Sequence, residues 1–226
     1  MPSTAADDLR TDARRNRDLI VAAARESFAE RGLSVSTNEV ARRAGVGIAT
    51  LLRRFPTRDH LVAAVFGDKM AAYNAAIADA LADPDPWAGF CDFIEHVCAM
   101  QAGDRGFTDV LTRWFPAAPE LEAERDRGAR DLAALLGRAK AQGGLRKDFA
   151  HQDVILVLMA NAGIVAAAGD AAPVASKRMV GYLLQAFAAS TAAPLPKPPS
   201  KAAIYRALTS GTAADQTSTP TKRGRS

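Results

Sequence analysis

The chain has 226 residues, of which 48% are hydrophobic and 24% are charged. This length and composition exclude a chain that is disordered throughout, and they suit one or two compact domains with a large apolar core. The formal net charge of +4 is unevenly distributed, because residues 1–66 carry +3, residues 67–190 carry −4 and residues 191–226 carry +5. We therefore expect anionic partners at the two ends of the chain rather than at its middle.

Apolar residues recur at spacings of three and four, and almost no stretch alternates with period two, so the sequence predicts an all-α fold. Gly, Pro and capping residues divide it into about nine helices. These helices are expected at about residues 12–30, 37–44, 48–55, 58–82, 86–102, 107–115, 118–142, 152–168 and 173–190. Their arrangement predicts two domains, an N-terminal three-helix domain over 12–58 and a larger helical domain over 59–190. A disordered arm is expected before them over 1–11. A Pro-rich, basic, mostly disordered tail is expected over 191–226, with a short helix at 201–208.

The sequence favours a cytoplasmic protein with no membrane partner. Its first residues contain no apolar segment typical of a secretory signal. The longest uncharged stretch, Val154–Gly169, is shorter than the roughly 20 residues that cross a bilayer. Cys91 and Cys98 lie seven residues apart on one predicted helix, a rise of about 10.5 Å, so they cannot form a disulfide with each other while that helix is intact.

Residues 36–55 carry the pattern of a helix-turn-helix. Ser36 and Glu39 form a capping-box pattern at the start of a short helix, and Gly45-Val46-Gly47 supplies a three-residue turn before the next helix. Pro56 then ends that second helix, since proline cannot continue the hydrogen-bond ladder. In a helix-turn-helix the second helix enters the major groove of DNA.

The second helix of this pair has a distinctive outer face. At 100° per residue, Leu51 and Phe55 define the inward stripe, so Ala49 and Arg53 point away from the core. An ordinary solvated face would be more polar than one that includes Ile48 and Ala49. Small and apolar side chains there suit close approach to DNA and contact with thymine methyl groups.

The segment STNEVARRAGVGIATLLRRFPTRDHLVAAVF resembles the DNA-binding segment of the tetracycline-repressor-like (TetR) transcriptional regulators. The matching positions are Thr37, Val40, Ala41, Ala44, Gly45, Val46, Thr50, Leu51, Phe55 and Leu61. The resemblance implies phosphate contacts from Thr37, Thr50, Arg54 and Arg58 and base-edge contacts from Asn38, Ile48 and Ala49, to which the facing argument adds Arg53. Leu52 stands where the family usually has Tyr, and the resemblance therefore places Leu52 at the interface without the hydroxyl that would bond phosphate.

The resemblance also implies that the larger domain binds a small-molecule effector and forms a homodimer. The two last helices, 152–168 and 173–190, fit such an interface, since one is apolar on all sides and the other is rich in Ala and Gly. Large side chains that gather on the middle helices predict a pocket for a largely apolar effector. They are Met70, Tyr73, Phe90, Phe93, Ile94, Met100, Phe107, Leu111 and Trp114, with His96 and Asn161 as candidate polar groups.

Together these features predict a ligand-responsive repressor that binds a near-palindromic double-stranded DNA operator as a homodimer and needs no cofactor or metal. Two alternatives stay open at this point. The first is a helical, dimeric small-molecule-binding protein without DNA binding, motivated by Leu52. The second is a small helical enzyme, although the spacing of Cys91, Cys98 and His96 matches no metal site. The sequence leaves open the operator, the effector, the sign of regulation and any redox role of the cysteines.

Overall fold

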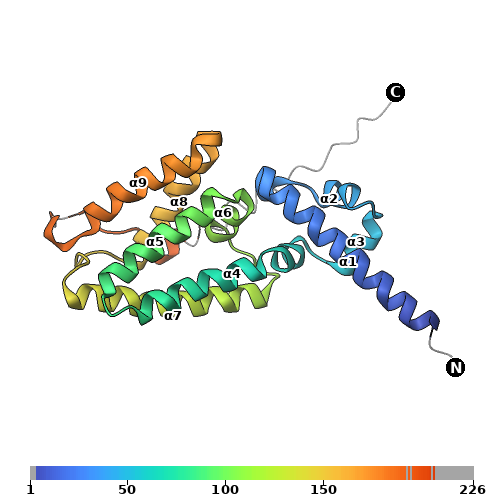
Figure 1. The fold of residues 1–226 in the computed structure, drawn as a ribbon, viewed down its shortest axis with the longest axis horizontal. Coiled ribbons are helices and arrows are strands. Elements are labelled where there is room, and N and C mark those ends of the chain that lie inside the picture. The colour runs from blue at the N-terminus through green and yellow to red at the C-terminus, as the bar shows by residue number, and fades with distance from the viewer. Residues whose placement is uncertain (1–3, 192, 194, 205, 207–226) are drawn as a thin grey trace.

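The computed structural model describes residues 4–191, 193, 195–204 and 206, and within these residues the fold is helical throughout. Three helices, α1 (Thr4–Arg31), α2 (Thr37–Arg43) and α3 (Ile48–Arg54), form a head at one end of an elongated molecule (Figure 1). A short 3-10 turn, η1 (Gly32–Ser34), joins α1 to α2. Buried Ile20, Phe28, Val40 and Leu51 form the centre of the head.

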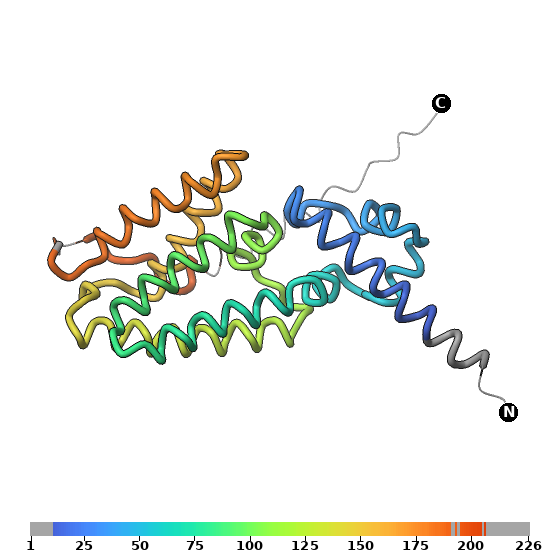
Figure 2. Tube along the Cα trace, viewed as in Figure 1, coloured from blue at the N-terminus to red at the C-terminus, as the bar shows by residue number. Residues whose placement is uncertain are grey.

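The body contains six further helices. The long helix α4 (Arg58–Ala82) leaves the head and runs beside α7 (Pro119–Gln142), as the tube in Figure 2 shows. Two helices, α5 (Pro86–Ala102) and α6 (Arg105–Thr112), pack between them and α8 (His151–Ala168). A 3-10 turn, η2 (Gly169–Ala171), leads from α8 into α9 (Ala172–Phe187), which packs on α5 and α8 and is followed by η3 (Ala189–Thr191).

The helix boundaries agree with the sequence patterns to within one residue, except in α1, at both ends of α6, at the end of α9 and in the C-terminal tail. The first helix begins at Thr4, not near Asp12, so residues 4–11 are helical and the predicted disordered arm is wrong for them. Good helix formers such as Ala5 and Ala6 extend the helix toward the N-terminus. Residues 1–3 lie outside the described residues. Helix α6 begins at Arg105, because the carboxylate of Asp104 accepts a hydrogen bond from the Phe107 amide at 3.1 Å and caps the helix there.

The other two differences concern the C-terminal part of the chain. Helix α9 ends at Phe187 because its last residues pair with the segment after α7, where the Arg146 amide donates to the Phe187 carbonyl at 3.0 Å. Part of the predicted disordered tail is also ordered. The buried Arg146 side chain donates to the Ala193 carbonyl, residues 201–204 are helical, and Ile204 is buried. Residues 207–226 of that prediction lie outside the described residues.

The α8 and α9 helices leave an apolar face uncovered. Leu156 and Met159 on α8 are 40% and 37% exposed, and Val174 and Tyr182 on α9 are 76% and 58% exposed. The stretch His151–Phe187 is long and apolar enough to cross a membrane by length and composition alone, and only 28% of its most apolar window is buried. The same apolarity and exposure are what a subunit interface requires.

Candidate nucleic-acid interface and ligand cavity

The turn between α2 and α3 is built as the sequence predicts, with one difference at its start. The Ser36 hydroxyl accepts a hydrogen bond from the Glu39 amide at 3.2 Å, which caps α2. The Glu39 carboxylate does not complete a capping box, because it binds two arginines instead. Gly45 has φ +68°, a conformation that a side chain would strain, and the Val46 amide closes the turn on the Ala41 carbonyl at 3.0 Å.

The facing predicted for α3 is confirmed. Leu51 is fully buried and Phe55 is 4% exposed, so these two residues fix α3 to the head. Ile48 and Leu52 are 38% and 46% exposed. The remaining interface residues predicted on α2 and α3 are exposed at Asn38, Ala49, Arg53 and Arg54 and half-buried at Thr37 and Thr50.

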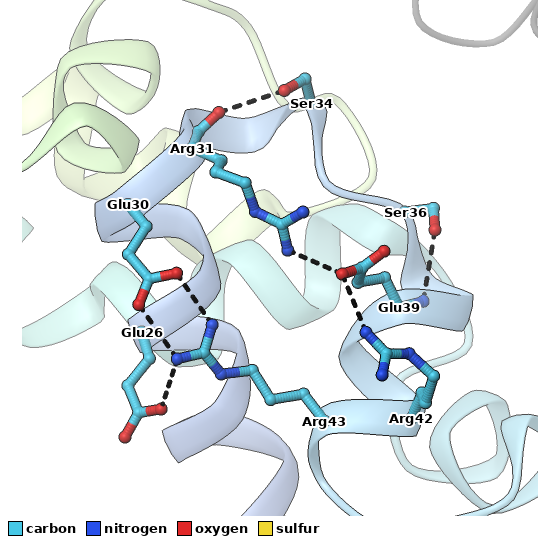
Figure 3. Close-up of polar contacts among 8 residues, drawn as sticks. All are labelled: Glu26, Glu30, Arg31, Ser34, Ser36, Glu39, Arg42 and Arg43. Carbon is cyan, nitrogen blue, oxygen red and sulfur yellow. Dashed lines mark hydrogen bonds and ion pairs between the residues drawn. The ribbon is translucent and has the colours of Figure 1, made fainter.

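Some arginines of the head form ion pairs with acidic residues, and others form none with the residues that the structure describes. Figure 3 shows that Arg43 on α2 binds Glu26 and Glu30 on α1, at 3.0 Å and 2.9 Å, and thereby holds the two helices together. Hydrogen bonding to Arg43 holds the pKa of Glu30 below its usual value, so this clamp is charged at neutral pH. Arg53 and Arg54 at the end of α3, in contrast, make no ion pair with any residue that the structure describes.

The same close-up shows how the next part of the chain is held to α2. Glu39 binds Arg31, the last residue of α1, at 3.0 Å and Arg42 at 3.2 Å. The hydrogen bond from Arg31 is the main cause that lowers the pKa of Glu39, with Arg42 adding to it. The Ser34 hydroxyl donates to the Arg31 carbonyl at 3.1 Å and fixes the η1 turn. These contacts set the position of α2, and through the turn that of α3.

Arg58, a predicted phosphate contact, binds a partner within the protein instead of pointing into solvent. Its guanidinium points into the protein, where Nη1 donates to the Val35 carbonyl at 2.8 Å and the cation lies 5.8 Å from the centre of the Phe28 ring. In this conformation Arg58 ties the start of α4 to the head. The sequence shows that a cation stands at this position, but it does not show that the cation binds the Val35 carbonyl inside the protein.

The predicted ligand residues only partly converge. Met70, Tyr73, Leu111 and Trp114 line a cavity of about 160 Å³. Sequence reasoning missed its other wall, which α7 and α8 supply: Arg125, Asp126, Ala129, Leu132, His151, Val154, Ile155 and Leu158. Arg125 belongs to a charged segment that reads as a solvated helix face, and His151 is isolated in the sequence. Only the packing of α4 and α6 on α7 and α8 brings these residues together.

The remaining predicted ligand residues are placed elsewhere. Phe90, Phe93, Ile94 and Phe107 are buried core residues, and Met100 packs half-buried against the core. Asn161 is a structural residue, because its amide nitrogen donates to the Cys98 carbonyl at 3.1 Å and to Gln101 Oε1 at 2.9 Å, which holds α8 to α5. None of these six residues lines the 160 Å³ cavity.

His96 borders a second, larger cavity of about 630 Å³ between α5 and α9, whose wall also includes Cys98. Burial raises the pKa of Cys91 and of Cys98 to about 12, so neither thiol is activated as a nucleophile. Among the residues that the structure describes, no group of three His, Cys, Asp or Glu side chains could hold a metal ion.

Two known protein families match this chain, one over the head and one over the body. Residues 20–65 match the family of bacterial regulatory proteins of the tetR type, and residues 85–186 match the C-terminal domain of SbtR-like transcriptional regulators. A TetR transcription regulatory protein from Mycobacterium vanbaalenii is 30% identical, with 80% of this chain and 99% of that chain covered and a TM-score of 0.46. The chain belongs to the TetR family. It is therefore a DNA-binding transcriptional regulator, and the enzyme alternative is excluded.

Two other solved transcriptional regulators share less of their sequence with this chain. The FadR regulator from Bacillus subtilis, solved with stearoyl-CoA, is 16% identical, covers 77% of this chain and 98% of its own, and has a TM-score of 0.57, which shows a shared fold. The regulator SCO0520 from Streptomyces coelicolor is 26% identical over 76% of this chain and 98% of its own, with a TM-score of 0.44. No curated protein matches this chain in sequence.

In this TetR-family chain, α6 links the DNA-binding head to the cavity. Asp109 on α6 accepts a hydrogen bond from the Leu33 amide of η1 at 2.6 Å. Gly106, one turn earlier, packs so closely on the head that an added Cβ would lie 2.9 Å from Phe28 Cβ. Leu111 and Trp114, which line the cavity, follow Asp109 within five residues. Helix α6 therefore contacts the head and also contributes to the wall of the cavity.

Proposed function

We propose that this protein is a ligand-responsive transcriptional repressor that binds a near-palindromic operator as a homodimer and is released by a small, largely apolar effector. DNA binding by α3 is supported mainly by the outer face of this helix. There Ile48, Ala49 and Leu52 are exposed beside the exposed guanidinium of Arg53. Apolar side chains on a basic helix face are suited to thymine methyl groups and nearby phosphates. We place the protein in the cytoplasm, where its DNA lies.

The uncovered face of α8 and α9 supports a homodimer. Leu156 and Met159 expose apolar surface on α8, and Gly163, also exposed, permits close helix approach beside them. Two copies of α8 and α9 related by a two-fold axis would bury this face in a four-helix interface. The two α3 helices would then read half-sites about one DNA turn, or about 34 Å, apart.

The contacts of α6 support control by an effector. A molecule in the cavity that favours a different position of α6 would move η1 and with it the head. Such an effector acts only through its preference for the conformation that does not fit the operator, and reversing a 99:1 ratio takes a preference of about 10⁴-fold.

Selection of bound duplexes from random DNA by the purified full-length protein tests the proposal. We expect enrichment of a near-palindromic sequence whose half-sites lie about one helical turn apart. Ala49→Glu, which places a carboxylate on the exposed face of α3, is expected to abolish the enrichment. The matched control Ala71→Glu makes the same change at an exposed position of α4 and is expected to retain it.

The oligomeric state is tested by the mass in solution. One chain has a mass of 23.9 kDa, so a dimer is expected at twice that value. Leu156→Arg on the exposed face of α8 should yield the monomer mass, while the control Leu19→Arg, exposed on α1, should leave the dimer intact. A dimer that enriches no DNA sequence would instead favour the alternative of a ligand-binding protein without DNA recognition.

A further inference from the structure

The cavity between α4, α6, α7 and α8 is small and mainly apolar. Its volume of about 160 Å³ is close to the roughly 150 Å³ of an engineered apolar cavity that binds benzene, so it holds a molecule about the size of one six-membered ring. Its walls include Met70, Leu132, Val154 and the Trp114 ring. A long acyl chain or a multi-ring compound would not fit without rearrangement of the helices.

One cation interrupts this apolar lining. The side chain of Arg125 on α7 is 15% exposed, lines the cavity, and lies with its guanidinium carbon 5.7 Å from the centre of the Trp114 ring. A guanidinium has five N–H donors. Here Nη1 donates to the Val110 carbonyl, and Nε lies 3.6 Å from Glu122 Oε2, an ion-pair distance that is too long for a hydrogen bond. Nη2 has no hydrogen-bond partner among the residues that the structure describes.

The other titratable groups around Arg125 leave room for a negative charge. The Glu122 carboxylate accepts a hydrogen bond from the Phe115 amide at 3.0 Å and lies 3.6 Å from Arg125 Nε, and burial raises the pKa of this carboxyl. Asp126 lines the cavity at its exposed rim. Burial lowers the pKa of His151, so its ring is neutral at neutral pH, and burial raises the pKa of Tyr73 to about 12, so its hydroxyl stays a hydrogen-bond donor.

We propose that the effector of this protein is a small cyclic carboxylate, about the size of benzoate, whose ring fills the apolar cavity and whose carboxylate pairs with Arg125. The proposal deepens the effector part of the proposed function and rests on it. A carboxylate matches the planar fork of a guanidinium, and it would accept a hydrogen bond from Nη2, which no described residue accepts. Tyr73 also lines this cavity, and its hydroxyl would be a further donor to the carboxylate.

Direct binding measured by calorimetry on the full-length protein tests the charge requirement. Benzoate and benzamide have nearly the same shape and differ in charge, so benzoate is expected to bind about ten- to a hundredfold more tightly, the range of a charge-assisted hydrogen bond. Equal affinities for the two probes, or no binding of benzoate, would overturn the proposal. This comparison uses the unchanged protein and does not depend on the folding of a variant.

A pair of variants tests the residue. Arg125→Gln should reduce the affinity for benzoate to that for benzamide, whereas the control Arg130→Gln, at an exposed position of the same helix, should leave both affinities unchanged. A folded Arg125→Gln protein that still prefers benzoate would contradict the role of Arg125. If the variant does not fold, the comparison of the two probes on the unchanged protein decides.

The last measurement separates this inference from the proposed function. The operator selected from random DNA is titrated with the protein in the presence and absence of benzoate, and release is expected at concentrations that saturate the calorimetric site. A protein that binds the operator but not benzoate refutes the effector class alone. A protein that binds benzoate but no DNA sequence refutes the proposed function and leaves the carboxylate site standing.

Discussion

Replacing Arg58 by Ala, with Arg54→Ala beside it, tests whether Arg58 stabilises the head rather than contacting DNA. The change removes the hydrogen bond to the Val35 carbonyl at 2.8 Å and the contact with the Phe28 ring at 5.8 Å. A hydrogen bond from a charged group contributes about 1.5–3 kcal/mol and a cation–π contact about 0.5–1 kcal/mol. The free energy of unfolding should therefore fall by about 2–4 kcal/mol, which lowers Tm by about 4–16 °C in a protein of this size.

The salt dependence of operator binding is the second measurement. Each phosphate contact contributes a slope of about −0.9 to a plot of log K against log salt concentration. Arg54→Ala, which removes an exposed and unpaired cation from both heads of a dimer, should flatten this slope by about 1.8 and change Tm little. Arg58→Ala should leave the slope unchanged, even where the affinity falls because the head is displaced.

The two variants thus have opposite signatures in thermal unfolding and in fluorescence-anisotropy titrations with the operator. The reasoning is refuted if Arg58→Ala flattens the slope while Tm stays within a degree of the unchanged protein. That result would mean that Arg58 leaves Val35 and Phe28 and reaches the phosphate backbone when DNA is bound.

Three further changes test other parts of the head. Leu52→Tyr restores the hydroxyl usual in the family at an exposed position, so operator affinity measured by anisotropy should rise about two- to tenfold per head with Tm unchanged. Glu30→Gln removes one of the two carboxylates that bind Arg43. Because the hydrogen bond from Arg43 lowers the pKa of Glu30 below its usual 4.5, the variant should have a lower Tm than the unchanged protein above that pH. The difference should vanish on acidification. Gly106→Ala puts a methyl group 2.6 Å from a phenylalanine ring of α4, so urea unfolding should show a loss of about 1–3 kcal/mol, whereas Gly137→Ala, with open space around it, should show none.

The head could be predicted from sequence because its signals are local. The cap at Ser36, the three-residue turn at 45–47 and the spacing of Leu51 and Phe55 each depend on residues within one or two turns, and each is found as expected. The inward turn of Arg58 could not be predicted in this way. It depends on a carbonyl 23 residues earlier and on the Phe28 ring, whose positions follow only from the packing of α1 against α4.

The lining of the 160 Å³ cavity is less accessible to sequence reasoning, because four helices assemble it. Apolar patterning selects Tyr73 and Leu111, which line this cavity, but it also selects Phe90, which the structure buries in the core. Asn161 is a candidate ligand group in the sequence because a polar residue on an apolar helix needs hydrogen-bond partners. In the structure these partners are Cys98 and Gln101 on α5. Arg125 looked like one of many surface charges, since its burial depends on residues of α4, α6 and α8.

The short helix α6 explains how a small ligand could control a distant surface. Gly106 in its first turn admits no side chain, and Asp109, one turn later, fixes the η1 turn by accepting a hydrogen bond from the Leu33 amide, so α6 is tied to the head. The carbonyl of the next residue, Val110, accepts the Nη1 hydrogen bond of Arg125. A carboxylate that draws the guanidinium toward the cavity would weaken that bond. Under the proposed effector class, the cation that pairs with the ligand is therefore also one of the contacts that hold α6 in place, which would couple ligand binding to release of the operator.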